Sequence, residues 1–269
     1  MSQNVLLDKL RAGEVALGVG LMYPAAGILE CIAPAFDWTW IDGQHGEFSY
    51  DSVLQAVWVS AAIRVASVVR VPSHEFGILG RYADTCPAGI MIPMVNDAEQ
   101  AKNVASALRL APAGSRSYGG RRVVDLGGRM YYKEQELIVI AQVETMESVR
   151  NAPAVIATPG IDVLFFGPDD MKTQLGLPIN TPITESKELR EGMAKTAKAA
   201  KEAGKFSGCV AGTPAALQMA VDMGYQLIVG GGDILFLREG SAKKIEELRN
   251  ALKTRQSARE APSTGIYGG

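Results

Sequence analysis

Eight short apolar runs, each followed by a segment with the apolar spacing of a helix, constrain the fold of this sequence most strongly. These runs are too continuous for half-exposed strands and suit a parallel sheet that is covered on both faces. Strict alternation of eight strands and helices over about 250 residues predicts an α/β fold, the (β/α)8 TIM barrel. The expected strand runs cover residues 15–22, 37–42, 66–71, 89–93, 137–144, 162–170, 206–211 and 225–230.

A doubly wound open sheet is the alternative fold for such an alternating pattern. It is disfavoured because the strand order shows no reversal point and no GxGxxG fingerprint follows the first strand. We expect one barrel domain over residues 1–253 and a disordered tail over residues 254–269. A glycine-rich stretch at residues 111–128 is long for a connection, and long connections in compact domains are often functional.

Charge and composition exclude several classes of function. The formal net charge of -2 gives no basic footprint for nucleic acid, and no apolar run is long enough to span a membrane. The first residues carry charges among the apolar positions, unlike a signal peptide. Three scattered cysteines, an odd number, favour free thiols over a disulfide framework. We therefore expect a cytoplasmic protein that handles a small molecule.

Polar residues stand at the carboxyl ends of several expected strands. In a TIM barrel these ends meet at one mouth, where active sites are built. The residues that the pattern brings to this mouth are Asp42, His45, Arg70, Gln142, Glu144, Asp169 and Asp170.

Glu144 and Asp170 are the candidate metal ligands. Each follows a buried apolar run, and a shared divalent cation offsets the repulsion between two such carboxylates. Oxygen ligands suit Mg²⁺, Mn²⁺ or Co²⁺, and an ion with few protein ligands keeps positions open for a chelating 2-oxo acid. A helix N-cap is an equally good interpretation of Asp169.

The remaining mouth residues supply the other parts of an enolate chemistry. Arg70 together with the metal would stabilise an enolate formed at the methyl carbon of a 2-oxo acid. His45, oriented by Asp42, would move the proton. Backbone N–H groups at Asp169 and Asp170 would hold the substrate carboxylate at a helix start.

Five motifs carry a resemblance to a known family over residues 4–252. They are Ile-Asp-Gly-Gln-His-Gly at 41–46, Val-Arg-Val-Pro at 69–72, Ile-Met-Ile-Pro-Met at 90–94, Ala-Gln-Val-Glu-Thr at 141–145 and Phe-Gly-Pro-Asp-Asp-Met at 166–171. With these motifs the chain resembles the HpcH/HpaI family of class II, metal-dependent pyruvate aldolases, which includes 4-hydroxy-2-oxoheptanedioate and 2-dehydro-3-deoxyglucarate aldolases.

The resemblance implies a role for each matched residue. His45 and Asp42 would form the base dyad, and Arg70 would bind the keto or enolate oxygen. Glu144 and Asp170 would hold the metal, with Gln142 and the turn at Pro168 and Asp169 near pyruvate. The resemblance also implies a hexamer, a trimer of dimers, in which the last helix packs on a neighbouring barrel and Asp84 reaches the adjacent subunit's site.

The expected function is a lyase. It would cleave 4-hydroxy-2-oxo acids to pyruvate or hydroxypyruvate and an aldehyde, or run the reverse addition, through a metal-bound enolate, with oxaloacetate decarboxylation as a side activity. Two alternatives stay open: a Schiff-base aldolase that uses Lys172, and a non-catalytic barrel that binds a metabolite. The sequence departs from the family at Gln44, commonly Glu, and at Asp169, commonly a neutral residue. The natural aldehyde, the metal and the stereochemistry stay open.

Overall fold

The protein folds into a closed barrel of eight parallel strands, as the computed structural model of residues 4–133 and 136–260 shows, with side chains described up to residue 253. The strand order around the barrel follows the sequence order, which confirms the predicted TIM barrel. The strands are β1 (Ala16–Leu21), β2 (Trp38–Asp42), β3 (Ala66–Arg70), β4 (Gly89–Ile92), β5 (Ile138–Val143), β6 (Val163–Phe166), β7 (Phe206–Val210) and β8 (Leu227–Gly232).

Helices connect these strands, and most begin at a capping side chain. Ser49, Asp97 and Thr145, for example, each accept a hydrogen bond from a backbone N–H of the first helical turn. The α-helices are α1 (Val5–Arg11), α2 (Ala26–Ile32), α3 (Tyr50–Ala62), α4 (Phe76–Ala83), α5 (Ala98–Leu108), α6 (Arg121–Gly127), α7 (Met146–Ala157), α8 (Pro168–Gln174), α9 (Lys187–Glu202), α10 (Pro214–Asp222) and α11 (Asp233–Glu260), with 3-10 turns η1 (Ala33–Ala35) and η2 (Tyr131–Lys133).

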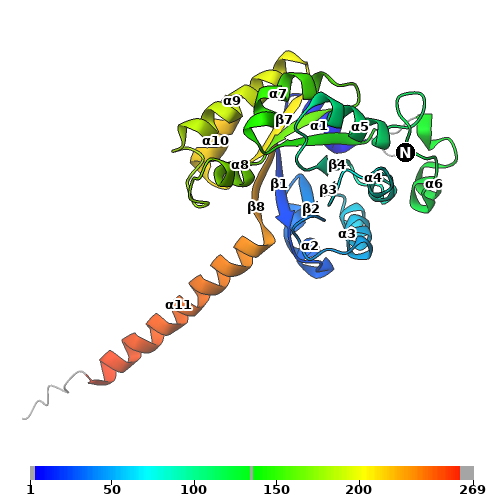
Figure 1. The fold of residues 1–269 in the computed structure, drawn as a ribbon. Coiled ribbons are helices and arrows are strands. Elements are labelled where there is room, and N and C mark those ends of the chain that lie inside the picture. The colour runs from blue at the N-terminus through cyan, green and yellow to red at the C-terminus, as the bar shows by residue number, and fades with distance from the viewer. Residues whose placement is uncertain (1–3, 134–135, 261–269) are drawn as a thin grey trace, which may run out of the picture. The chain divides into compact units, whose positions relative to one another are not determined.

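The barrel closes where β1 meets β8, and Figure 1 shows these two strands side by side. The buried carboxylate of Asp233, which follows β8, accepts hydrogen bonds from the backbone N–H groups of Met22 and Tyr23 after β1. The two backbone N–H groups that follow β1 thereby find their hydrogen-bond acceptor on the chain that follows β8, where the barrel closes.

Two apolar clusters hold the barrel together. One lies inside it, where Trp38 and Phe165 are fully buried and α1 contributes Leu6 and Leu10. The other lies between the strands and the surrounding helices. A Cβ atom at Gly18 would stand 2.3 Å from the Trp38 indole, so only glycine lets this ring fill the barrel interior. This packing fixes the strand ends that carry the polar residues.

The last helix extends further than the sequence pattern predicts. Its backbone continues to Glu260, whereas the apolar repeat ends at Leu252 and a disordered tail was expected from residue 254. For residues 254–260 that expectation is wrong, because this stretch lacks the glycine or proline that ends a helix. The expected tail residues 261–269 lie outside the described part of the chain.

The chain divides into two compact units, the first ending at Asp233 and the second beginning at Ile234. Among the described residues, no helix combines the length and apolar character that crossing a membrane requires.

Candidate active site at the carboxyl ends of the strands

Four of the predicted polar residues meet inside the barrel mouth. Asp42 ends β2, Arg70 ends β3, Gln142 lies near the end of β5, and Glu144 follows that strand. The register of the sheet places Asp42 directly beside Arg70. All four residues are at most 7% exposed, although each is polar or charged. The sequence prediction that these strand ends converge is confirmed for this group.

Asp42 and Arg70 form a buried, two-pronged ion pair. The Nε atom of Arg70 donates to Oδ1 of Asp42 at 2.9 Å, and Nη2 donates to Oδ2 at 2.5 Å. Burial opposes the charge of Asp42, but the hydrogen bonds and charge of Arg70, with the backbone N–H groups of His45 and Gln44, hold the pKa of Asp42 below its usual value. The arginine also lies 4.7 Å from the centroid of the Trp40 ring. Its guanidinium is therefore fixed in position.

His45 follows this ion pair in a tight loop. Its backbone N–H donates to Oδ1 of Asp42 at 3.2 Å, and its side chain is exposed. Both carboxylate oxygens of Asp42 accept hydrogen bonds from Arg70, and among the described residues the His45 ring donates none to them. The expected base dyad of Asp42 and His45 stays a prediction. A Cβ atom at Gly46 would stand 2.4 Å from the Asp42 carbonyl oxygen, so the loop needs a glycine there. Asp42 thus positions the loop of His45 through the backbone.

Glu144 lies on the other side of Arg70. Its Oε1 atom is 3.8 Å from Nη1 of Arg70, and its Oε2 atom accepts the backbone N–H of Met94 at 2.9 Å. Met94 has the positive φ angle of 53°, which is unusual for a side chain of this size and turns its N–H toward the carboxylate. A Cβ atom at Gly167 would stand 2.7 Å from Cγ of Glu144. The glycine therefore leaves the space in which this side chain lies.

The electrostatics around Glu144 fit a divalent cation. Burial raises the pKa of Glu144, and the negative charges of Asp170 and Asp42 raise it further. The hydrogen bond from the Met94 N–H and the positive charge of Arg70 lower it, but the net shift is upward. The Oε1 atom of Gln142 is buried without a hydrogen-bond partner among the described residues. A cation between Glu144 and Asp170 would relieve the repulsion between the carboxylates. Within the described residues, no three His, Cys, Asp or Glu side chains gather as metal ligands, so two carboxylates would leave most positions to substrate and water.

The raised pKa of Glu144 leads to a prediction about stability. The folded protein holds the Glu144 proton more tightly than the unfolded chain does, so ionisation costs stability as the pH rises above 4.5, the ordinary value. We expect the metal-free Glu144→Gln variant to resist urea better than the metal-free parent at about pH 7, with the difference vanishing below about pH 4. Urea unfolding with a chelator present measures this. A variant less stable than the parent at neutral pH would contradict the expected sign.

The turn after β6 forms the first part of α8. Asp169 and Asp170 are exposed in the first turn of this helix, and Pro168 is its first residue. Lys172 is buried and donates to Oδ1 of Asp169 at 3.0 Å and to the Ile179 carbonyl oxygen at 3.1 Å. Asp170 thus faces solvent beside Glu144, while Asp169 is engaged by the lysine. Lys172 lies on a helix and is held by an ion pair.

Asp84 lies away from this cluster within its own chain. It caps the carboxyl end of α4, before β4 begins, and therefore lies toward the amino ends of the strands. Its Oδ1 atom accepts a hydrogen bond from Nη2 of Arg116 at 2.6 Å. Arg116 is 4% exposed and the Asp84 side chain is 29% exposed, so the glycine-rich stretch contributes a partly buried ion pair with Asp84. The predicted role of Asp84 in an adjacent subunit's site stays a prediction.

Three residues of the site had no functional assignment from the sequence. Trp40 supports Arg70, the Met94 N–H binds Glu144, and Gly167 makes room for that carboxylate. The available signal for Trp40 was its position two residues before Asp42, because every second residue of a strand points to the same face and Trp40 packs with Trp38 inside the barrel. Met94 and Gly167 stand in motifs that were recognised without a role for these positions.

The comparisons with known proteins agree with this fold. The sequence pattern of the HpcH/HpaI aldolase/citrate lyase family matches residues 24–238. A 4-hydroxy-2-oxovalerate aldolase of Novosphingobium aromaticivorans is 32% identical over 93% of this chain and 96% of its own length. A hydroxypyruvate/pyruvate aldolase of Chromohalobacter salexigens is 34% identical over 80% of this chain and 85% of its own. The crystal structure of an HpcH/HpaI aldolase/citrate lyase family protein from Burkholderia cenocepacia superposes with a TM-score of 0.83 at 30% identity, covering 92% of this chain and 100% of that one. The chain belongs to the HpcH/HpaI aldolase/citrate lyase family.

Proposed function

We propose that this protein is a class II, divalent-metal-dependent aldolase. It cleaves 4-hydroxy-2-oxo acids to pyruvate or hydroxypyruvate and an aldehyde, and it runs the reverse addition. The observation that carries this proposal is the buried cluster of Asp42, Arg70, Gln142 and Glu144 next to Asp170. The names of the relatives, which are pyruvate, hydroxypyruvate and 4-hydroxy-2-oxovalerate aldolases, support the substrate class.

Glu144 and Asp170 would hold the cation, for which Mg²⁺, Mn²⁺ and Co²⁺ are the candidates. When bound, the ion supplies Lewis-acid stabilisation of the negative charge that develops on the 2-oxo acid. Burial on the Glu144 side strengthens that stabilisation, because Glu144 is 3% and Gln142 is 1% exposed, whereas Asp170 faces solvent. Gln142 has a side-chain amide available to orient the substrate, since its Oε1 atom has no partner among the described residues.

His45 and Arg70 carry out the steps that move a proton and receive charge. In cleavage His45 takes the proton of the C4 hydroxyl, directly or through water, and the C3–C4 bond breaks to release the aldehyde. The electron pair of that bond delocalises onto the keto oxygen, where the fixed Arg70 guanidinium stabilises it. Protonation at C3 then yields pyruvate. Pro168, the first residue of α8, has no backbone N–H group. The backbone N–H groups of Asp169 and Asp170 therefore bind the substrate carboxylate.

A metal-dependence assay tests this function. We expect pyruvate release from a 4-hydroxy-2-oxo acid to stop after chelation and to return when Mg²⁺, Mn²⁺ or Co²⁺ is restored. Oxaloacetate decarboxylation should follow the same pattern, because it passes through the same enolate. Borohydride added with pyruvate should trap no adduct, since Lys172 is held by Asp169 and Ile179. Activity that survives chelation together with a trapped adduct would favour the Schiff-base alternative, and absence of turnover with all three metals would favour a non-catalytic barrel.

We also propose a homo-hexamer in the cytoplasm. The three cysteines are free thiols, the state that a reducing compartment maintains. The helix α11 carries Ile245, Leu248 and Leu252 at a spacing that puts them on one face, which suits packing on a neighbouring barrel.

A charge on that face tests the assembly. We expect the parent to sediment with six times the 28.6 kDa chain mass and Leu248→Glu to form smaller species. The control is Lys243→Glu, which places the same side chain elsewhere on α11 and should keep the parent's mass. Equal masses for all three proteins would contradict a role of this face in assembly.

A further inference from the structure

A cavity of about 400 Å³ opens at the end of the barrel opposite the candidate active site. Leu137, Asp162 and Phe206, which line it, stand just before or at the start of β5, β6 and β7. Because all strands are parallel, this places the cavity at their amino ends, whereas Asp42 and Glu144 lie at or after the carboxyl ends. The proposed aldol reaction makes no use of this cavity.

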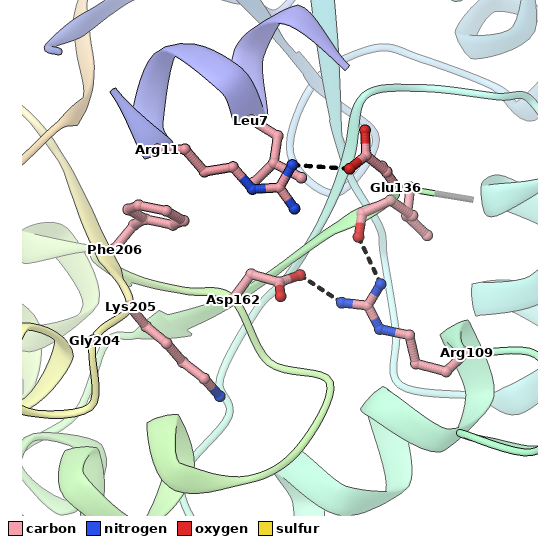
Figure 2. Close-up of a pocket in the computed structure, with 9 residues that line it drawn as sticks. Leu7, Arg11, Arg109, Glu136, Asp162, Gly204, Lys205 and Phe206 are labelled. Carbon is pink, nitrogen blue, oxygen red and sulfur yellow. Dashed lines mark hydrogen bonds and ion pairs between the residues drawn. The ribbon is translucent and has the colours of Figure 1, made fainter. Parts of the chain in front are cut away.

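Three cationic and two acidic side chains surround the cavity, which Figure 2 shows in close-up. Arg109 is held by three hydrogen bonds: it donates to the carbonyl oxygens of Leu137 and Gly160, both at 2.8 Å, and to Oδ2 of Asp162 at 2.5 Å. Lys205 donates to the carbonyl oxygens of Ile156 at 2.6 Å and Thr158 at 3.0 Å. These contacts fix one side of the cavity. The lining residues carry one more positive than negative charge, and the carboxylate of Asp8 beside Arg11 lies outside the lining.

Arg11 differs from the other two cations because most of its donors are uncommitted. Its Nη1 atom donates to Oε1 of Glu136 at 2.8 Å and lies 3.8 Å from Oδ1 of Asp8, and its side chain is 54% exposed. A guanidinium carries five N–H groups, and Arg11 has no further hydrogen-bond partner among the described residues. Planar N–H pairs of this kind bind carboxylates in a two-pronged geometry.

The remaining wall of the cavity is apolar. Leu7, Leu137 and Phe206 line it, and Figure 2 shows Leu7 and the Phe206 ring together with Arg11 around the cavity. A ligand that suits both walls has one anionic group for the arginine and an apolar part for the ring and the leucines. We infer that this cavity binds a small organic monocarboxylate with an apolar part, at a site separate from the barrel mouth.

Benzoate is the probe for this inference, and benzamide is its neutral counterpart of the same shape. We expect calorimetric titration of the full-length protein to show benzoate binding and at least about tenfold weaker benzamide binding, because the amide lacks the charge that Arg11 pairs with. Arg11→Gln should weaken benzoate binding about tenfold. The matched control is Arg150→Gln, on the exposed face of α7, which should bind benzoate as the parent does. Both variants should keep the parent's aldolase activity.

Three results would overturn the inference. Benzoate could fail to bind at millimolar concentration, or it could bind the parent and Arg11→Gln equally, which would place it elsewhere, such as at a metal ion in the mouth. Equal affinity for benzoate and benzamide would show that charge does not drive binding. None of these results depends on turnover, so failure of this inference is separate from failure of the proposed function.

Discussion

The kcat/KM of the Glu144→Gln variant is expected to be about 10² to 10³ fold lower than that of the parent. Glutamine keeps the shape of the side chain, and its Oε1 atom can still accept the Met94 N–H that holds Glu144 at 2.9 Å. The substitution removes one of the two negative charges proposed to hold the cation, so metal affinity should fall as well. A titration with Mn²⁺, followed by the spectroscopic signal of the free ion, measures that affinity separately from turnover. High Mn²⁺ concentration should restore part of the activity.

Glu147→Gln is the matched control for this prediction. Glu147 lies three positions further along the chain, in the first turn of α7, and its side chain is exposed. The same substitution there should change activity by no more than about twofold, since exposed positions of this kind contribute little. A Glu144→Gln protein that binds Mn²⁺ as the parent does would show that the metal site lies elsewhere.

The fold and the membership of the mouth could be predicted because both follow from pattern and topology. Continuous apolar runs indicate covered strands, and parallel strands bring their carboxyl ends to one place. Asp42, Arg70, Gln142 and Glu144 were therefore found from the sequence alone. Which of them pair could not be predicted, because pairing depends on the register of β2 against β3, which sets Asp42 beside Arg70. For this reason the sequence did not indicate that Arg70 contacts the Asp42 carboxylate.

Local backbone geometry limited the sequence prediction in other places. The glycine-rich stretch at residues 111–128 contains the short helix α6, bounded by Gly120 and Gly128 at positive φ angles of 83° and 68°. Glycines at positive φ angles bound helices and are also frequent in loops, so glycine content alone does not distinguish a short helix from a loop. The positive φ angle of Met94, which aims its N–H at Glu144, has no sequence signal at all.

Arg70→Gln is expected to damage both stability and activity, because Arg70 is the partner of two buried carboxylates. Removing it leaves Asp42, which is 2% exposed, without its charge partner and takes a cation from beside Glu144. Breaking a buried ion pair by removing one member typically costs about 3 to 5 kcal/mol. We expect a loss of that size in the free energy of unfolding, measured in urea at neutral pH. The loss of a fixed charge at the keto oxygen should lower kcat about 10² to 10³ fold.

The double variant Asp42→Asn/Arg70→Gln separates these two effects. It leaves two neutral amides in place of the ion pair, so the buried charge that lacks a partner is gone and much of the unfolding free energy should return. Activity should stay low, because neither amide supplies the positive charge that receives the developing enolate. Recovery of kcat in the double variant would show that Arg70 serves only to neutralise Asp42. A single Arg70→Gln variant as stable as the parent would contradict the expected loss. It would show that Asp42 takes up a proton at little cost, although its contacts with Arg70 lower its pKa in the parent.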